Sequence, residues 1–283
     1  MAERIQRFED ITPNYDVVLC DVWGVLHNGV DAFAEASDAL IAARKAGATV
    51  VLLTNSPRPT PGVTAQLRLI GVPDEAYDGT VTSGDVTRKL IAEGPKKVFL
   101  LGPERDLPLI EGLGVERTSA EEAGAIVCSG FFDDERETPE TYREMLSAFI
   151  ARGVPMICAN PDLVVERGSR IIPCAGAIAQ LYDRLGGETR IAGKPHRPIY
   201  EAALSLAAGL RGGTLDKARV IAIGDGMVTD VRGALDHGLD LLYISGGIHA
   251  ADYVQEGRTN EALLADFLAR HDAHARYWMP RLA

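Results

Sequence analysis

Short apolar runs alternate with longer amphipathic stretches along the whole chain. Residues 17–20 and 48–53 form two runs rich in valine and leucine, a pattern typical of strands buried on both faces of a sheet. Between them, apolar residues recur at helical spacing from Asp31 onward, and Gly47 follows where a helix would commonly end. A strand, a helix and a second strand in this order predict an α/β fold with a parallel sheet joined by crossover helices.

The same alternation continues to the far end of the chain. Further strands are expected at 97–102, 125–129, 154–159, 189–192, 219–223 and 239–245. Further helices are expected at 60–70, from around 81–84, at 104–111, 138–152, 175–185 and 198–210, after 230 to His237, and in the C-terminal region. Residues 160–173 lack clear periodicity and predict a loop with a hairpin. Because the sequence contains no low-complexity linker, a second domain would have to be an insertion.

Composition and charge exclude several classes of protein. The chain has 283 residues, a formal net charge of −11 and no basic run, so binding of nucleic acid is disfavoured. Its four cysteines form no CxxC pair, which favours reduced core thiols over disulfides or a zinc site. The N-terminus is charged, and no apolar run is long enough to cross a bilayer. We therefore expect a cytoplasmic protein that does not bind membranes.

Polar residues recur at the ends of the predicted strands. They are Asp21, Thr54, Asn55, Lys194, Asp225 and Asp230. In open parallel sheets, ligands bind at the carboxyl ends of the strands, so these side chains are expected to converge there. Converging carboxylates suit Mg²⁺, which prefers oxygen ligands, and a lysine beside them would neutralise phosphoryl oxygens. Because an aspartate can also attack phosphorus and form an aspartyl-phosphate, the set predicts phosphoryl transfer.

The residues around these positions resemble four motifs of the haloacid dehalogenase superfamily. They read Asp21-Val22-Trp23-Gly24-Val25-Leu26, Leu53-Thr54-Asn55, Gly193-Lys194-Pro195 and Gly224-Asp225-Gly226 through Asp230. Segments 159–162 and 173–176 resemble cap segments of the class IIA branch, which includes phosphatases of small molecules and nucleoside monophosphates. The resemblance implies a Rossmann-like, doubly wound parallel-sheet core (1–80 and 189–283) that carries an inserted α/β cap domain (81–188).

The resemblance also implies a metal site and a nucleophile. Asp21 would be the nucleophile and a ligand of Mg²⁺, and Trp23 would offer only its backbone carbonyl to the ion. Asp225 would be a further ligand, and Asp230 would support the ion or its waters.

The remaining motif residues would bind the substrate. Thr54 and Asn55 would hold the phosphoryl group, and Lys194 would neutralise its charge. The implied function is a Mg²⁺-dependent phosphatase that releases phosphate from a small phosphorylated metabolite through an aspartyl-phosphate on Asp21.

One position departs from the family pattern. Family phosphatases usually carry a second aspartate two residues after the nucleophile, where it protonates the leaving oxygen and later activates water. Trp23 occupies that position here, and an indole N–H is not a usable acid or base near neutral pH. Loss of a positioned acid typically costs about 10²–10⁴ in rate. Three alternatives follow: the substrate carries a good leaving group, another residue such as His27 or His196 supplies the proton, or turnover is slow or absent. Trp23 itself could pack against the substrate or the cap.

Two other functions are left open by the sequence. The chain could be a catalytically impaired protein that binds phosphorylated ligands for regulation; Trp23 favours this reading, whereas the retained nucleophile and Lys194 disfavour it. A dinucleotide-dependent enzyme would fit the fold class, but Gly224-Asp225-Gly226 lacks a third glycine and comes late in the chain.

Arg167 and Arg170 in the predicted cap could meet an anionic substrate, although surface salt bridges are the simpler interpretation. A homodimer is also possible, because capped relatives often form dimers.

Overall fold

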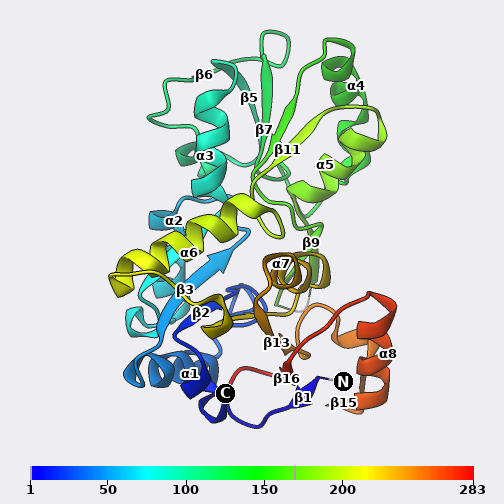
Figure 1. Ribbon diagram of the computed structural model, residues 1–283. Coiled ribbons are helices and arrows are strands. Elements are labelled where there is room, and N and C mark those ends of the chain that lie inside the picture. The colour runs from blue at the N-terminus through cyan, green and yellow to red at the C-terminus, as the bar shows by residue number, and fades with distance from the viewer. Residues whose placement is uncertain (1, 169) are drawn as a thin grey trace.

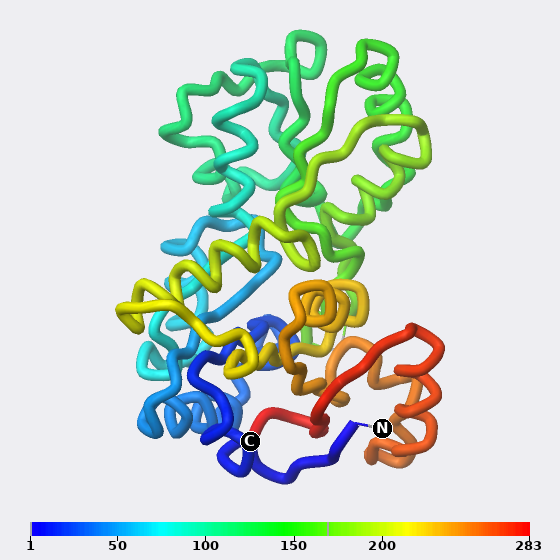
Figure 2. The backbone as a smooth tube through the Cα atoms, in the orientation of Figure 1, coloured from blue at the N-terminus to red at the C-terminus, as the bar shows by residue number. Residues whose placement is uncertain are grey.

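The computed structural model describes residues 2–168 and 170–283. It contains a seven-stranded and a five-stranded parallel sheet in two bodies, which lie one above the other in Figure 1. Figure 2 shows that both ends of the chain lie in the body of the seven-stranded sheet, whereas the middle of the chain forms the other body. We refer to the first body as the core (sheet strands within 3–82 and 220–279) and to the second as the cap (sheet strands within 97–191). The predicted α/β fold class is confirmed.

The core sheet has the strand order β1-β16-β13-β12-β2-β3-β4, and every neighbouring pair is parallel. Its strands are β1 (Glu3–Arg4), β2 (Val17–Cys20), β3 (Thr49–Thr54), β4 (Gly79–Thr82), β12 (Val220–Gly224), β13 (Asp240–Ile244) and β16 (Tyr277–Met279). Strands β2, β3 and β12 are buried along their whole length, because helices cover both faces of the sheet.

Helices wind around the core sheet on both sides. Val18 and Cys20 of β2 pack with α1 (Ala34–Lys45) and α2 (Thr60–Ile70) on one face. Val17 and Leu19 point the other way, toward α6 (Arg197–Arg211), α7 (Arg232–His237) and α8 (Glu261–Arg270). Successive residues of a strand thus pack into two apolar clusters on opposite faces of the sheet. This explains why the strands appear in the sequence as continuous apolar runs.

The cap repeats this architecture on a smaller scale. Its sheet has the order β11-β8-β7-β5-β6 with parallel pairing throughout. The strands are β5 (Lys97–Leu101), β6 (Glu116–Arg117), β7 (Ala125–Cys128), β8 (Met156–Cys158) and β11 (Thr189–Ile191). Helices α4 (Arg143–Ala151) and α5 (Ala175–Arg184) pack on one face, and α3 (Ser83–Glu93) packs on the other. An antiparallel hairpin of β9 (Val164–Arg167) and β10 (Arg170–Pro173) reaches toward the core.

Several predicted elements differ in detail. The helix expected at 104–111 is a 3₁₀ helix at Glu104–Leu109, because Pro108 inside it cannot donate a backbone hydrogen bond. The helical C-terminal region contains α8, but it also holds a small hairpin, β14 (Val254–Gln255) with β15 (Arg258–Thr259), and the core strand β16. The remaining short helices are 3₁₀ turns at Phe8–Asp10, Thr12–Asn14, Asp74–Ala76, Pro139–Tyr142, Lys217–Arg219 and Ala250–Asp252, and a π-helical turn at Met227–Val231.

The sheet to which each strand belongs shows where the chain passes between the core and the cap. Val81 and Thr82 belong to core strand β4, whereas Thr189 to Ile191 form cap strand β11. We therefore propose that the insertion begins after Thr82 and ends after Ile191, slightly later at both ends than expected. Over the described residues, no helix has the length and apolar character needed to span a membrane.

Candidate active site

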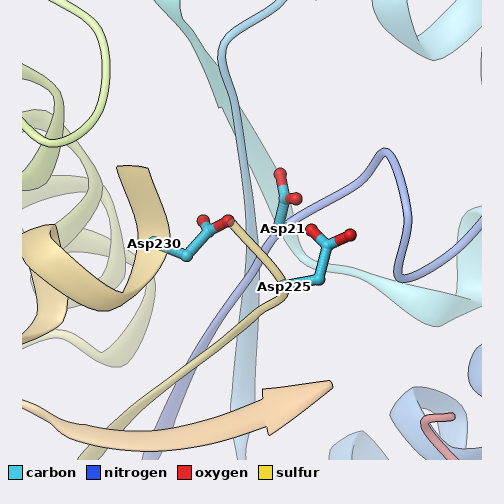
Figure 3. A group of neighbouring side chains, drawn as sticks. All are labelled: Asp21, Asp225 and Asp230. Atoms are coloured by element: carbon cyan, nitrogen blue, oxygen red, sulfur yellow. The ribbon is translucent and has the colours of Figure 1, made fainter. Parts of the chain in front are cut away.

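Three carboxylates converge at the carboxyl end of the core sheet. Asp21 directly follows β2, Asp225 directly follows β12, and Asp230 lies in the π-helical turn that leads into α7. One oxygen of each lies within 4.8 Å of the others (Figure 3). The three residues are only 5–7% exposed. Three acidic groups are therefore held close together with little water to screen their charges.

Strand register explains this convergence. Cys20 of β2 lies opposite Ile223 of β12, so the residues that follow both strands leave the sheet at the same edge. Glycine then allows the backbone to approach the acids. A Cβ atom on Gly247 would lie 1.9 Å from Asp225 Oδ2, and one on Gly224 would lie 2.3 Å from Asp230 Cγ. These positions therefore require glycine if the carboxylates are to keep their places.

Lys194 connects two of the acids. Its Nζ donates hydrogen bonds to Asp21 Oδ1 (2.6 Å) and Asp230 Oδ1 (2.7 Å), and its side chain is almost completely buried. Burial alone would lower the pKa of Lys194, but attraction to Asp21, Asp230 and Asp162 outweighs it and raises the pKa well above its usual value. Lys194 is thus a fixed positive charge in the centre of the site.

One lysine does not balance three buried carboxylates. Burial, and next the charge of Asp230, raise the pKa of Asp21 well above its usual value although Lys194 opposes this. The same two causes raise the pKa of Asp225 to about 7. A divalent cation would relieve this repulsion, and a donor set of carboxylate oxygens is the kind that Mg²⁺ prefers. The residues present therefore fit a magnesium site.

A cavity of about 230 Å³ opens onto these groups. All seven residues predicted from the sequence line it: Asp21, Trp23, Thr54, Asn55, Lys194, Asp225 and Asp230. The cap closes it with hairpin residues 163–166 and with Asp162. The residues predicted from the sequence thus border one cavity, whose other wall comes from the cap.

Asn55 lies between the core and the cap. Its side-chain oxygen accepts a hydrogen bond from the backbone N–H of Lys194 (2.7 Å). Its side-chain nitrogen donates to Asp162 Oδ1 (2.8 Å) and more weakly to the Lys194 carbonyl oxygen (3.3 Å). The neighbouring Thr54 Oγ1 accepts from the backbone of Ser56 (3.2 Å). The side-chain amide of Asn55 therefore positions Lys194 and Asp162.

Trp23 contacts the cap. Its indole N–H donates a hydrogen bond to the backbone carbonyl of Glu166 in β9. Its ring packs edge-on against His27, with 5.0 Å between ring centroids. Gly29, at φ +87°, allows the indole to lie close, since a Cβ there would be 2.3 Å from Trp23 Cζ2. Of the alternatives considered for Trp23, packing against the cap is what the structure shows.

The two histidines considered as proton donors do not line the cavity. His27 is 2% exposed, its Nδ1 accepts from the backbone of Gly29, and burial lowers its pKa to about 4. His196 lies in a different surface pocket, beside Pro195 and Arg232. Each is therefore poorly placed to protonate a leaving group.

Two further residues of the cavity wall were missed as site residues. Asp162 was noted only as part of a cap segment, and its proximity to Asn55 depends on how the cap folds onto the core. His249 lies in the loop after β13, where its Nε2 accepts from the backbone of Met227 (3.2 Å). Nothing in the local sequence distinguishes His249 from an exposed loop histidine.

Comparisons with known proteins agree with the motifs. A family model described as haloacid dehalogenase-like hydrolase matches residues 18–116, and a HAD-hydrolase-like model matches residues 191–271. A haloacid dehalogenase-like hydrolase from Brucella suis 1330 is 54% identical, with a TM-score of 0.90 over 99% of this chain and 100% of that chain.

More distant proteins are similar over most of the chain. An acid sugar phosphatase from Staphylococcus aureus is 25% identical over 249 residues, which cover 85% of this chain and 90% of that protein. The p-nitrophenyl phosphatase from Archaeoglobus fulgidus shares the fold, with a TM-score of 0.70, 24% identity and coverage of 94% of this chain and 96% of that chain. The chain therefore belongs to the haloacid dehalogenase superfamily, as a class IIA hydrolase.

Proposed function

We propose that this hydrolase is a Mg²⁺-dependent phosphatase of small phosphorylated metabolites that works through an aspartyl-phosphate on Asp21. The observation that carries the proposal is the convergence of Asp21, Asp225, Asp230 and Lys194 around one cavity. A site that only bound a phosphate would not need a buried carboxylate at its centre, because an anion repels an anion. The phosphatases among the relatives support the same reaction.

Within this proposal, Asp21 provides the nucleophile. One of its carboxylate oxygens attacks phosphorus, the ester P–O bond breaks, and the alcohol oxygen leaves with the bonding electrons. Water then attacks the phosphorus of the aspartyl-phosphate, which releases inorganic phosphate and regenerates the carboxylate. Lys194, which donates to Asp21 Oδ1 at 2.6 Å, would stabilise the charge that develops on the phosphoryl oxygens. Thr54 and Asn55 border the same cavity and would hold the remaining oxygens.

Hydrogen bonding within the cluster supports different roles for the three acids. Both oxygens of Asp230 are used, Oδ1 by Lys194 and Oδ2 by the backbone N–H of Gly226 (3.1 Å). For Asp225, Oδ2 accepts from Ile248 (2.8 Å), which leaves Oδ1 for an ion. We infer that Asp21, Asp225 and the carbonyl of Trp23 would hold Mg²⁺ directly and that Asp230 would support it. The ion would supply positive charge that lets an anionic nucleophile approach a phosphate.

The test is phosphate release from p-nitrophenyl phosphate with Mg²⁺. We expect turnover by the wild-type protein and none above background by Asp21→Asn. The matched control is Asp266→Asn, which makes the same change on the exposed face of α8 and should keep full activity. Equal phosphate release by wild type and Asp21→Asn would remove Asp21 from the mechanism.

A phospho-ligand-binding protein is the second candidate, because Trp23 holds the place of the usual acid and contacts the cap. Melting measurements would separate the two functions. A rise in Tm with phosphorylated metabolites, without phosphate release from any of them, would favour binding.

A further inference from the structure

A second cavity, of about 290 Å³, adjoins the catalytic one between the core and the cap. The two share the lining residues Trp23, Thr54, Asp162 and Val165. A substrate whose phosphate lies among the carboxylates could therefore extend past the indole of Trp23 into this space. The chemistry of this second cavity would then decide which substrates bind.

Three arginines from separate parts of the chain line the second cavity. Arg58 follows β3 in the core, Arg105 lies in the 3₁₀ helix after β5, and Arg167 ends β9. Arg167 is already paired: its Nη1 and Nη2 donate to the two oxygens of Asp134 at 3.1 and 2.6 Å. Such a two-bond pair neutralises both partners. The charges available for a ligand are therefore those of Arg58 and Arg105.

Neither of these two guanidinium groups has a hydrogen-bonded acid among the described residues. Arg58 Nη1 donates to Gln66 (2.9 Å), while its Nε lies 3.8 Å from Asp106 Oδ1, beyond hydrogen-bonding distance. Arg105 Nη2 lies 3.7 Å from Asp134 Oδ2, an oxygen that Arg167 already uses. Arg58 is only 30% exposed in its side chain, so part of its hydration is lost while its counter-charge, Asp106, forms no hydrogen bond with it.

The electrostatics of the cavity agree with this geometry. Burial lowers the pKa of Arg58; Asp106 opposes this, and the positive charges of Arg105 and Arg167 add to it. Burial also raises the pKa of Asp106, although Arg105 and Arg58 oppose this. An anion placed between Arg58 and Arg105 would remove the repulsion between the arginines and replace the lost hydration of Arg58.

We propose that Arg58 and Arg105 bind a second anionic group of the substrate, a carboxylate or a further phosphate, while the phosphate to be cleaved lies beside Asp21. The proposal rests on the proposed phosphatase function and narrows its substrates to small phosphorylated metabolites with two acidic groups. It also gives a functional reason for the cap to lie over the core, since one arginine comes from each.

Matched substrates test this inference. We would compare three series of equal chain lengths: ω-hydroxyalkyl phosphates, ω-carboxyalkyl phosphates and alkanediol bisphosphates. In wild type, kcat/KM should be at least tenfold higher for one of the acidic series at its best length, mainly through a lower KM. Comparison of the two acidic series shows whether the second anionic group that the arginines prefer is a carboxylate or a phosphate. Equal kcat/KM for acidic and hydroxyl members at every length would overturn the proposal.

Variants identify the residues. The double variant Arg58→Gln/Arg105→Gln should reduce the ratio of kcat/KM between acidic and hydroxyl substrates at least tenfold. The control Arg143→Gln makes the same change on exposed α4 of the cap and should leave the ratio unchanged. An unchanged ratio in the double variant would assign the preference elsewhere and contradict the proposal.

A binding experiment separates this inference from the proposed reaction. In Asp21→Asn with Mg²⁺, the acidic compounds should raise Tm more than the hydroxyl compounds, and the double arginine change should remove the difference. If wild type released no phosphate but this difference persisted, the phosphatase function would fail and the second anion site would stand. If wild type cleaved p-nitrophenyl phosphate but the difference were absent, only the anion site would fail.

A second inference comes from a different residue, Asp162. It lines both cavities and therefore lies at their junction, where the phosphate of a bound ester would meet the rest of the molecule. Asn55 holds its Oδ1 (2.8 Å), and its backbone N–H donates to Asn160 Oδ1 (3.0 Å), so the carboxyl is fixed in place. Burial raises the pKa of Asp162, although Lys194 and Asn55 oppose this.

We infer that Asp162 supplies the proton that Trp23 cannot. As the Asp21–P bond forms and the ester P–O bond breaks, the proton of Asp162 moves to the leaving oxygen and an alcohol departs. The resulting carboxylate then accepts a proton from the water that attacks the aspartyl-phosphate. Asp162 is protonated again at the end, so the cycle balances, and the acid comes from the cap rather than from the core.

Leaving-group dependence tests this role. Asp162→Asn keeps an oxygen that can accept from Asn55 but cannot donate a proton as an acid. We expect kcat on alkyl phosphates to fall about 10²–10⁴-fold and kcat on p-nitrophenyl phosphate to fall much less, because nitrophenolate leaves without a proton. A plot of log kcat against leaving-group pKa should steepen in Asp162→Asn but not in the control Asp266→Asn, which makes the same change on the exposed face of α8. An equal loss on all substrates would show that Asp162 only positions Asn55.

Discussion

The core and the cap are built alike but differ at the ends of their strands. Both are parallel sheets with helices on two faces. In the core, β2 and β12 lead directly into the buried acids Asp21 and Asp225. In the cap, β7 is followed by the neutral Ser129, and β8 by Ala159 and Asn160.

This difference shows how one architecture can serve two purposes. The core concentrates three buried carboxylates and a lysine where an ion and a phosphate would offset their charges. The cap strands end in neutral polar groups, and the cap adds Asp162 and two arginines to the cavities. We therefore expect changes at the core carboxylates and Lys194 to remove the reaction, and changes in the cap, apart from Asp162, to alter substrate binding or to lower the free energy of unfolding slightly.

Beyond Asp21, the largest effect on turnover of p-nitrophenyl phosphate should come from Lys194. Lys194→Met removes the only cation within hydrogen-bonding distance of Asp21 and Asp230 among the described residues. We expect kcat/KM on p-nitrophenyl phosphate to fall about 10²–10³-fold, the usual effect of losing one positioned donor. Lys45→Met, at the exposed end of α1, serves as the control. Activity above one tenth of wild type would show that the charge of Lys194 is dispensable.

The next largest effect should be stabilisation of the folded core by bound Mg²⁺. An ion bound only by the folded protein adds about 2.7 kcal/mol when its concentration is one hundred times Kd. Thermal unfolding with increasing Mg²⁺ should show this rise in wild type and lose most of it in Asp225→Asn. If Asp225→Asn gained as much stability as wild type, the ion would bind elsewhere.

Loss of the hydrogen bond between Trp23 of the core and Glu166 of the cap should have an intermediate effect, on KM. Trp23→Phe keeps an aromatic ring but removes the hydrogen bond to the Glu166 carbonyl. A net hydrogen bond contributes about 0.5–1.5 kcal/mol, so we expect KM for p-nitrophenyl phosphate to rise about two- to tenfold as the cap loses one of its contacts. A fall in kcat of several hundredfold with unchanged KM would instead place the indole in the reaction itself.

The smallest effect is expected at the outer end of the cap. Arg117 and Glu104 form an ion pair at 2.6 Å with side chains 41% and 70% exposed. Solvent screens such a pair, so Arg117→Gln should lower the free energy of unfolding by about 0–1 kcal/mol and leave kcat/KM unaltered. Denaturant titration measures this, and a loss above 2 kcal/mol would mean that the cap depends on surface charge.

Local pattern was sufficient to predict the buried strands and the motif residues. Strands β2 and β3 are covered on both faces, so every residue in them is buried and apolar or small. This signal lies within four to six consecutive residues and can be recognised without knowledge of the rest of the chain. Asp21 and Asp225 each stand directly after such a strand. Parallel pairing alone is then enough to bring them to one edge of the sheet.

Features that depend on distant parts of the chain could not be predicted. Strands β1 and β16 are two and three residues long and come from opposite ends of the chain, so neither has a local signal strong enough to identify it. The hydrogen bond between Asn55 and Asp162 joins residues 107 positions apart. Arg58 and Arg105 likewise line the same cavity only because the cap folds back over the core.

The side chain of Asn55 has a consequence for how the two bodies move. Through one amide group it holds the backbone of Lys194 on one side and Asp162 of the cap on the other. A cap that moved away from the core would break the hydrogen bond from the Asn55 nitrogen to Asp162. The Asn55 oxygen could still accept from the Lys194 backbone, but the amide plane would lose the partner that fixes it from the cap side. A closed cap would therefore hold Asn55, and through it the backbone of Lys194, more firmly than an open one.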